Sequence, residues 1–180
     1  MVLLLIYLCT ALLVSFLCSL MESVLLSSSA SYIETISTKS KGGMIMKQLK
    51  SDVDKSIAAI LALNTLANTI GAAGVGAQAV VVFGNEYFGI ASIVLTLLIL
   101  IFSEIIPKSI GANYWRTLAP HLSYLIKGAT YVAYPFVIMS RIITKLTSKK
   151  NAQTISREEL VALTNIGEKQ GVFESNESKI

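Results

Sequence analysis

The stretch from Ile99 to Gly111 reads Ile-Leu-Ile-Phe-Ser-Glu-Ile-Ile-Pro-Lys-Ser-Ile-Gly and closes an apolar run that begins at Gly89. The run is long and apolar enough to predict a helix in lipid, and it leads directly into the carboxylate of Glu104. A charged side chain at the centre of a membrane helix costs about 2.5–3.5 kcal/mol on insertion scales. Glu104 is therefore expected at the membrane edge, or turned inward toward a group that compensates its charge.

Pro107 follows three residues later and has no amide hydrogen, so it leaves the carbonyl of Ser103 without its helical partner and predicts a helix break. A carboxylate beside a freed carbonyl oxygen offers the oxygen ligands that hard cations prefer. The simpler interpretation is a helix end at the membrane surface, where Glu104 pairs with Lys108 four residues on. This stretch alone leaves both interpretations open.

The composition predicts an integral membrane protein. Of 180 residues, 53% are hydrophobic and 14% are charged, and the mean hydropathy is +0.66, whereas soluble domains carry about 25% charged residues. The net charge of +4 is interpreted through its distribution around the membrane spans rather than as affinity for nucleic acid. His121 is the only histidine, and Cys9 and Cys18 lie in one apolar segment, so no zinc site is expected.

Three apolar segments predict three full spans, at 1–26, 56–83 and 87–106. The polar segment 28–55 between the first two carries five lysines, and we expect two short amphipathic helices there, with a break at Gly42-Gly43. Residues 118–146 are also apolar, but if they crossed the membrane, the basic residues that follow would lie outside. The positive-inside rule therefore predicts a juxtamembrane or re-entrant helical pair, with the N-terminus outside and the C-terminus in the cytoplasm.

Polar side chains recur inside each predicted span. Ser15, Ser19, Ser23 and Ser27 are spaced four residues apart and share one face of the first helix, while Asn64 and Asn68 share a face of the second. With Glu104 at the end of the third span, antiparallel threading places these groups at similar depth. Hydroxyl, carboxamide and carboxylate oxygens suit Mg²⁺ or Na⁺, and the alternative is that they only bond helices together.

The segment 151–180 is expected to be a cytosolic acidic helical linker that follows a membrane domain at 1–150. Ser156 is a good N-cap, with Glu159 at the capping-box position. Because the pattern stops at Ile180 before the helix is complete, we expect a further cytosolic domain in the whole protein.

Three motifs resemble those of the CorC and cyclin M (CNNM) family of magnesium transporters. The first-helix run from Ser15 to Ser27 has spaced serines and a Glu22-Ser23 pair, and Asn64-Thr-Leu-Ala-Asn68 is similar to the paired asparagines of the second helix. The most specific is Ser103-Glu-Ile-Ile-Pro-Lys108, which resembles a Gly-Glu-Ile-x-Pro-Lys signature with serine in place of glycine.

This resemblance implies an all-α homodimer with three spans per protomer, juxtamembrane helices and Mg²⁺ transport, with export coupled to Na⁺. It assigns the ion ligands to Ser19, Ser23, Asn64, Asn68 and Glu104, and gives Lys108 the role of a partner for Glu104 or of a structural residue. ATP is expected only on cytosolic CBS modules outside this sequence, and no enzyme activity is implied. The alternative function is a Mg²⁺-sensing membrane regulator that does not itself transport.

Overall fold

The computed structural model describes residues 1–139, which contain helices and no strand. The bounds of the elements are Val2–Ser27 (α1), Ala30–Ser37 (α2), Lys41–Ser51 (α3), Val53–Phe83 (α4), Phe88–Leu98 (α5) and Ile106–Val132 (α6). A 3₁₀ turn, Asn85–Tyr87 (η1), joins α4 to α5, and a π-helix, Ile99–Ile105 (η2), joins α5 to α6. The predicted linker at 151–180, and its boundary with the membrane domain, lie outside the described residues.

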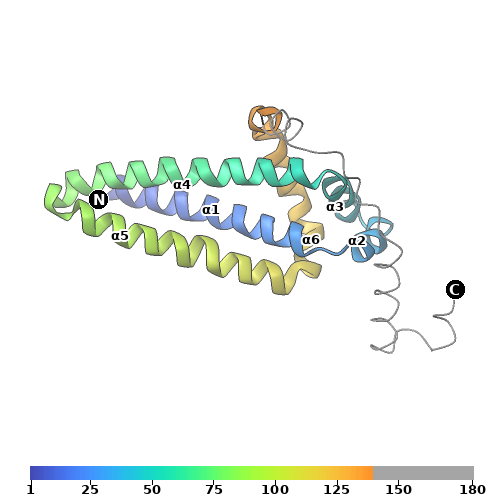
Figure 1. Ribbon diagram of the computed structural model, residues 1–180. Helices are drawn as coiled ribbons and strands as arrows, with labels where there is room; N and C mark the ends of the chain where they lie inside the picture. The colour runs from blue at the N-terminus through green and yellow to red at the C-terminus, as the bar shows by residue number, and fades with distance from the viewer. Residues whose placement is uncertain (140–180) are drawn as a thin grey trace, which may run out of the picture. The chain divides into compact units, whose positions relative to one another are not determined.

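Three helical stretches are long and apolar enough to cross a membrane, which confirms the predicted all-α membrane fold: Val2–Ser27, Val53–Phe83 and Asn85–Val132. In Figure 1, α1, α4 and α5 lie lengthwise side by side, and the N-terminus lies at the same end as the turn between α4 and α5. Large apolar side chains such as Leu13 (65% exposed) and Ile93 (63%) point outward, as expected for helices whose solvent is lipid.

The main apolar core lies at the other end of the bundle, where α1 ends and α4 begins. There Leu25 of α1, Met46 of α3, Ile60 of α4 and Ile126 of α6 are fully buried in one cluster. Because four elements meet in this cluster, it fixes the C-terminal half of α1 against its neighbours.

The juxtamembrane segment forms two helices, as predicted, but the predicted break at Gly42-Gly43 is wrong. Both glycines lie in the first turn of α3, and the hydroxyl of Ser40 caps that helix by accepting a hydrogen bond from the Gly43 amide at 3.0 Å. A Cβ atom at Gly42 would overlap the carbonyl oxygen of Pro120, so this glycine permits close contact with α6. The glycine pair thus reflects tight packing, and the chain turns instead just before Ser40.

Lys50 of α3 closes the C-terminal end of α1. Its Nζ donates to the carbonyl oxygens of Leu25 and Leu26 at 2.8 and 3.3 Å. The last turn of α1 has no basic residue of its own, so a lysine from another helix satisfies these carbonyl groups and stabilises the negative end of the helix dipole. Partial burial lowers the pKa of Lys50.

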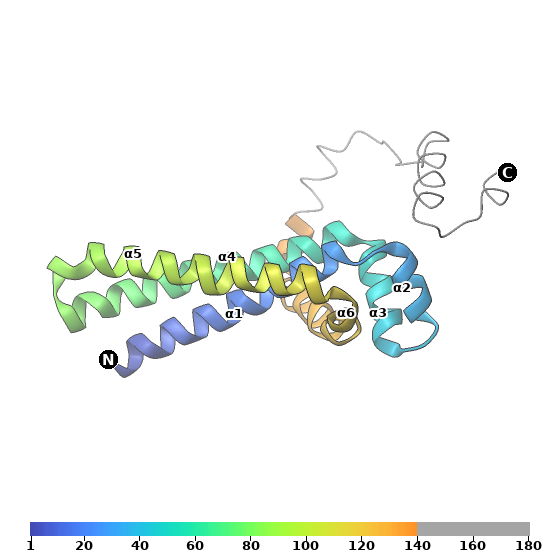
Figure 2. The same ribbon diagram turned by 90° about the horizontal axis from the view of Figure 1, so that it is seen from below.

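The chain does not break at Pro107, contrary to the prediction. The π-helix η2 leads directly into α6, with Pro107 in its first turn, and the backbone departs from helical geometry only at Tyr114, where φ is −108° and ψ is 17°. Pro107 thus lies at the junction between the π-helix and α6, where its missing amide hydrogen costs one backbone hydrogen bond without ending the helix. Beyond the kink, α6 runs crosswise to the spans rather than along them (Figure 2), so residues 118–132 do not continue the third span.

Aromatic side chains hold this kink. The Trp115 ring packs edge-on against Tyr32 of α2 with 5.1 Å between centroids, and the Tyr32 hydroxyl donates to the Arg116 carbonyl oxygen at 2.6 Å. The Arg116 guanidinium lies 5.2 Å from the centre of the Trp115 ring. Such residues favour the boundary between lipid and water, which agrees with a juxtamembrane position.

The glycines of α4 pack against helices of the same protomer. A Cβ atom at Gly71 would overlap Ala11 of α1, and one at Gly74 would lie 2.6 Å from the Tyr7 ring. The small residues from Gly71 to Ala77 are typical of close contacts between membrane helices, and from the sequence they predict a contact between protomers at Gly74. In the structure, Gly74 instead serves the α1–α4 interface. The predicted homodimer therefore rests on the family resemblance and not on this glycine.

Candidate cation site

The serine stripe of α1 faces the other two spans and makes direct bonds to both. Ser15 is fully buried, and its hydroxyl donates to Oδ1 of Asn64 in α4 at 2.6 Å. Ser23, two turns further along, donates to the backbone carbonyl oxygen of Lys108 in α6 at 2.7 Å. These bonds place two of the five predicted ligand residues, Ser23 and Asn64, at helix–helix contacts.

Between these two bonds lies Ser19, which is fully buried and whose Oγ has no hydrogen-bond partner among residues 1–139. In α4, one turn beyond Asn64, the Oδ1 atom of Asn68 is likewise buried and unpartnered within the described part of the chain. An unpaired buried polar group costs about 1–3 kcal/mol. Two such atoms on neighbouring spans therefore require an explanation, and a bound cation would provide one.

Glu104 lies in the π-helix η2, next to a contact with α1. The hydroxyl of its neighbour Ser103, which is fully buried, donates to the Leu12 carbonyl oxygen at 3.1 Å. The Glu104 side chain is half-buried, and it has no ion pair or hydrogen bond within residues 1–139. π-Helical turns often occur at functional sites, and Pro107, which follows, leaves one carbonyl group of this turn without an amide partner.

The predicted ligands do not all meet at one level. Because α1 and α4 are antiparallel and touch at Ser15–Asn64, Ser19 lies one turn, about 6 Å, toward the lysine-rich end, and Asn68 lies one turn toward the other end. The Ser103–Leu12 contact brings η2 to α1 near the Ser15–Asn64 level. Asn64, Asn68 and Glu104 thus form an upper group, while Ser19 and Ser23 form a lower group closer to Lys108.

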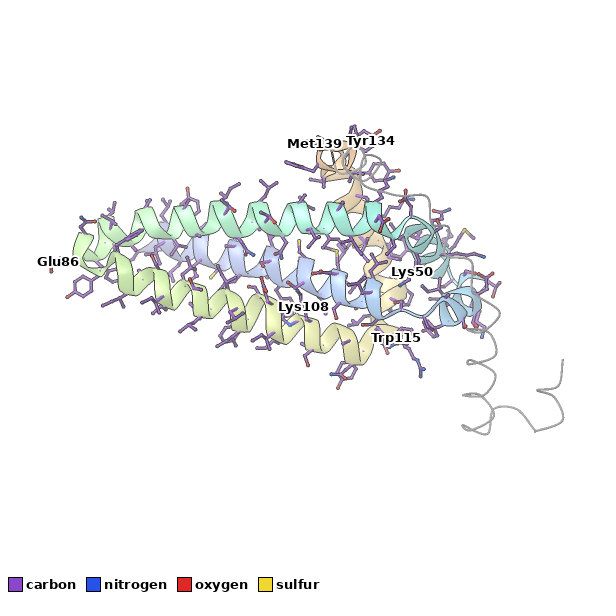
Figure 3. The ribbon with its side chains drawn as sticks, viewed as in Figure 1. Lys50, Glu86, Lys108, Trp115, Tyr134 and Met139 are labelled. Carbon is purple, nitrogen blue, oxygen red and sulfur yellow. The ribbon has the colours of Figure 1, made fainter. Side chains whose placement is uncertain are left out.

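Lys108 pairs with a different carboxylate from the one expected. Its Nζ lies 3.5 Å from Oε2 of Glu22 in α1, and no ion pair joins it to Glu104 within residues 1–139. Figure 3 shows the labelled Lys108 side chain lying between α6 and α1. The pair is partly exposed, with 16% of the Glu22 side chain accessible. Lys108 thus neutralises the acidic residue of α1, whereas Glu104 has no ion pair in the part of the chain that the structure describes.

Sequence reasoning missed two residues that position this site. Ser15 was assigned only to the stripe, although its proton is what orients Asn64. Gly111 of α6 lies so close to Ser23 that a Cβ atom there would be 2.7 Å from the serine Cβ. Pro107 and Gly111 are four residues apart and are both buried on one face of α6. This spacing is the sequence signal that could have identified the contact.

The site offers oxygen ligands only. Residues 1–139 contain no group of three or more histidine, cysteine or acidic side chains that could hold a metal. The bonds of Ser23 and Asn64 do not remove them as ligands, because a hydroxyl that donates keeps its lone pairs and a carboxamide oxygen has two. Neutral oxygens around one free carboxylate favour a hard cation over zinc or copper.

The chain is similar to known membrane proteins over most of its length. Residues 5–177 match the family profile described as "Cyclin M transmembrane N-terminal domain". A UPF0053 protein of Synechocystis is 28% identical over 91% of this chain and 48% of its own length. A UPF0053 inner membrane protein of Escherichia coli is 29% identical over 56% of the chain and 24% of its own length. A chloroplastic DUF21 domain-containing protein of Arabidopsis thaliana is 23% identical over 81% of the chain and 23% of its own length. The chain thus spans at most about half the length of these relatives.

Proposed function

The chain belongs to the cyclin M transmembrane family, and from this premise we propose that it carries Mg²⁺ across the membrane. One observation carries the proposal: three oxygen groups on three different spans, Ser19 Oγ, Asn68 Oδ1 and the Glu104 carboxylate, have no partner among the described residues. Each was predicted as a ligand before its surroundings were known. Buried polar atoms without partners are few in native proteins, so their coincidence with the predicted ligands supports a cation path.

Two groups of ligands at different depths suit transport of an ion better than its permanent binding at one site. Mg²⁺ requires near-octahedral geometry at about 2.0–2.1 Å and usually keeps several waters. In this proposal the lower hydroxyls of Ser19 and Ser23 receive the partly hydrated ion from the lysine-rich end, and the upper group, with Glu104, binds it next on the way out. Ser15 and the Lys108 carbonyl orient the ligands, in the manner of groups that fix metal-binding side chains.

Glu104 supplies the charge in this arrangement. Serine and asparagine oxygens are neutral and cannot offset the loss of water around a divalent cation in a medium of low dielectric constant. Because Glu22 is paired with Lys108, Glu104 is the carboxylate near these ligands that has no ion pair within residues 1–139 and can bind the ion. Export coupled to Na⁺, a homodimer, and ATP binding on CBS modules elsewhere in the protein complete the proposal as properties implied by the family.

Flux measurements on Glu104→Gln test the proposal. This variant keeps the shape and one oxygen but removes the charge, so we expect loss of Mg²⁺ binding by calorimetry and of Mg²⁺ flux in proteoliposomes. Asn68→Ala removes only a neutral dipole and should weaken binding less. Near-native Mg²⁺ affinity in Glu104→Gln would refute the assignment, since an exposed helix-end carboxylate contributes only about 0.3–0.5 kcal/mol through an i,i+4 pair.

The same experiment separates transport from sensing. A regulator would use the same ligands, so binding alone does not distinguish the two functions. Wild-type protein that binds Mg²⁺ but passes none under either a Mg²⁺ or a Na⁺ gradient would favour the regulator.

A further inference from the structure

A second polar cavity lies away from the cation path, where α3, the start of α4 and the end of α6 meet. Its volume is about 320 Å³, within the range of about 300–1,000 Å³ that is typical of ligand sites. Its polar lining consists mainly of Gln48, Asp52, Lys55, Lys127, Tyr131 and Tyr134. Figure 3 labels Tyr134 close to Met139, at the end of the described chain.

The cavity gathers two basic side chains that have no ion pair within residues 1–139. Lys47 and Lys108 are each paired with a glutamate, at 2.6 and 3.5 Å, whereas Lys55 and Lys127 are not. Among the described residues that line the cavity, these two lysines and Asp52 give a formal charge of +1. An anion with a single charge complements this lining.

The position of the cavity corresponds to the surface of the bilayer. Asp52 is the N-cap of the span α4, and the phenol rings of Tyr131 and Tyr134 are 72% and 56% exposed, as is typical of tyrosines at headgroup depth. Ala133 and Val137 pack on Ala59 of α4, so the wall that carries the tyrosines is fixed to the span.

Exposed apolar side chains follow the tyrosines of the cavity along the chain. Phe136 and Met139, two and five residues beyond Tyr134, are 41% and 62% exposed. A molecule with a charged head in the cavity and a hydrocarbon tail would meet these apolar side chains beside the headgroup site.

We propose that this cavity binds the headgroup of a membrane lipid with one net negative charge, a phosphodiester such as phosphatidylglycerol. Lys55 and Lys127 bind the phosphate oxygens, and Gln48 with the tyrosine hydroxyls bonds the rest of the headgroup. Basic pockets between membrane helices on the cytoplasmic side are known to hold anionic lipids. This site is independent of the cation path and of the transport proposal.

Native mass spectrometry of protein released from nanodiscs tests the site. The nanodiscs contain equal amounts of phosphatidylglycerol and phosphatidylcholine, and the retained lipid is counted by mass. We expect the wild type to retain phosphatidylglycerol selectively. Lys55→Gln with Lys127→Gln should reduce this retention about 30-fold, since each lysine near anionic lipid contributes about fivefold. The matched control, Lys39→Gln with Lys41→Gln, removes the same charge from exposed lysines outside the cavity and should change retention less than twofold.

A paired Lys55→Arg and Lys127→Arg variant guards against loss of folding, because it keeps the charge and should retain the lipid. Equal retention of both lipids by the wild type would overturn the proposal, as would an equal loss in the control variant. Thermal stabilisation by millimolar inorganic phosphate, without stabilisation by phosphatidylglycerol vesicles, would assign the cavity to a soluble anion and refute a lipid.

Discussion

Replacing Asn68 with leucine should have the opposite effect on stability from the same replacement one turn earlier. Oδ1 of Asn68 is buried without a partner among the described residues, so Asn68→Leu removes an unpaired polar atom and keeps the branching of the side chain at Cγ. In the absence of Mg²⁺ we expect stability to stay the same or rise, by up to about 1–3 kcal/mol. Asn64→Leu instead removes the acceptor of the 2.6 Å bond from Ser15. Such bonds between membrane helices contribute about 0.6 kcal/mol on average and about 1.7 at most.

Mg²⁺ should then stabilise the Asn68→Leu variant less than it stabilises the wild type. A ligand at 100 times its Kd stabilises the native state by about 2.7 kcal/mol, and a tenfold weaker Kd leaves about 1.4 kcal/mol at the same concentration. We expect Asn68→Leu to lose at least this difference of about 1.3 kcal/mol, because an apolar side chain replaces a ligand. Thermal unfolding in detergent, with and without Mg²⁺, measures both the stability of the free protein and the stabilisation by Mg²⁺ on the same sample.

One result would refute the reasoning. If Asn68→Leu destabilises the protein without Mg²⁺ as much as Asn64→Leu does, and the stabilisation by Mg²⁺ is intact, then Asn68 has a structural partner and is no ligand.

Three further predictions follow from the packing. Gly111→Ala places a methyl group 2.7 Å from a serine of α1 and should cost about 1–3 kcal/mol of stability by overpacking, with reduced Mg²⁺ flux; Gly128→Ala, with open space around it, is the matched control and should behave as wild type. Lys50→Met removes the cap on α1 and should lower the free energy of unfolding by about 1 kcal/mol, measured by thermal unfolding; an unchanged midpoint would mean that water satisfies these carbonyls equally well. In a cysteine-free background, an impermeant reagent outside the cell should label Asn85→Cys and leave Arg116→Cys unlabelled; the reverse pattern would overturn the predicted orientation.

The spans could be predicted from sequence because apolar length is a property of each segment alone. The three predicted spans match helices of the structure, and so do the two juxtamembrane helices. Predictions were wrong where the role of a residue depends on a contact with a residue far away in the sequence. Gly42 and Gly74 were interpreted as a break and as a protomer contact, yet both allow contacts with helices far away in the sequence. Lys108 was assigned to Glu104 by its i,i+4 spacing, but Glu22 of α1 lies nearer.

In the candidate site, too, features within one helix could be predicted from sequence, whereas contacts between helices could not. Residue types and spacing identified the serine stripe and the paired asparagines, because a four-residue repeat places side chains on one face of a helix. The register between antiparallel helices is set by contacts such as Ser15–Asn64, and no single helix contains that information. The expected common level of all five ligands is therefore replaced by two groups, one at the level of this contact and above it, and one that begins a turn below it.

The kink at Tyr114 divides α6 into two helical arms that lie at an angle to each other. One arm continues the span that carries Glu104 and is held to α1 by the Ser23 hydroxyl on the Lys108 carbonyl. The other arm lies crosswise beneath the bundle and is in close contact with α3, where Gly42 meets Pro120. Because both arms belong to one continuous helix, we expect a displacement of the crosswise arm to tilt the arm that continues to Glu104, with no change of secondary structure.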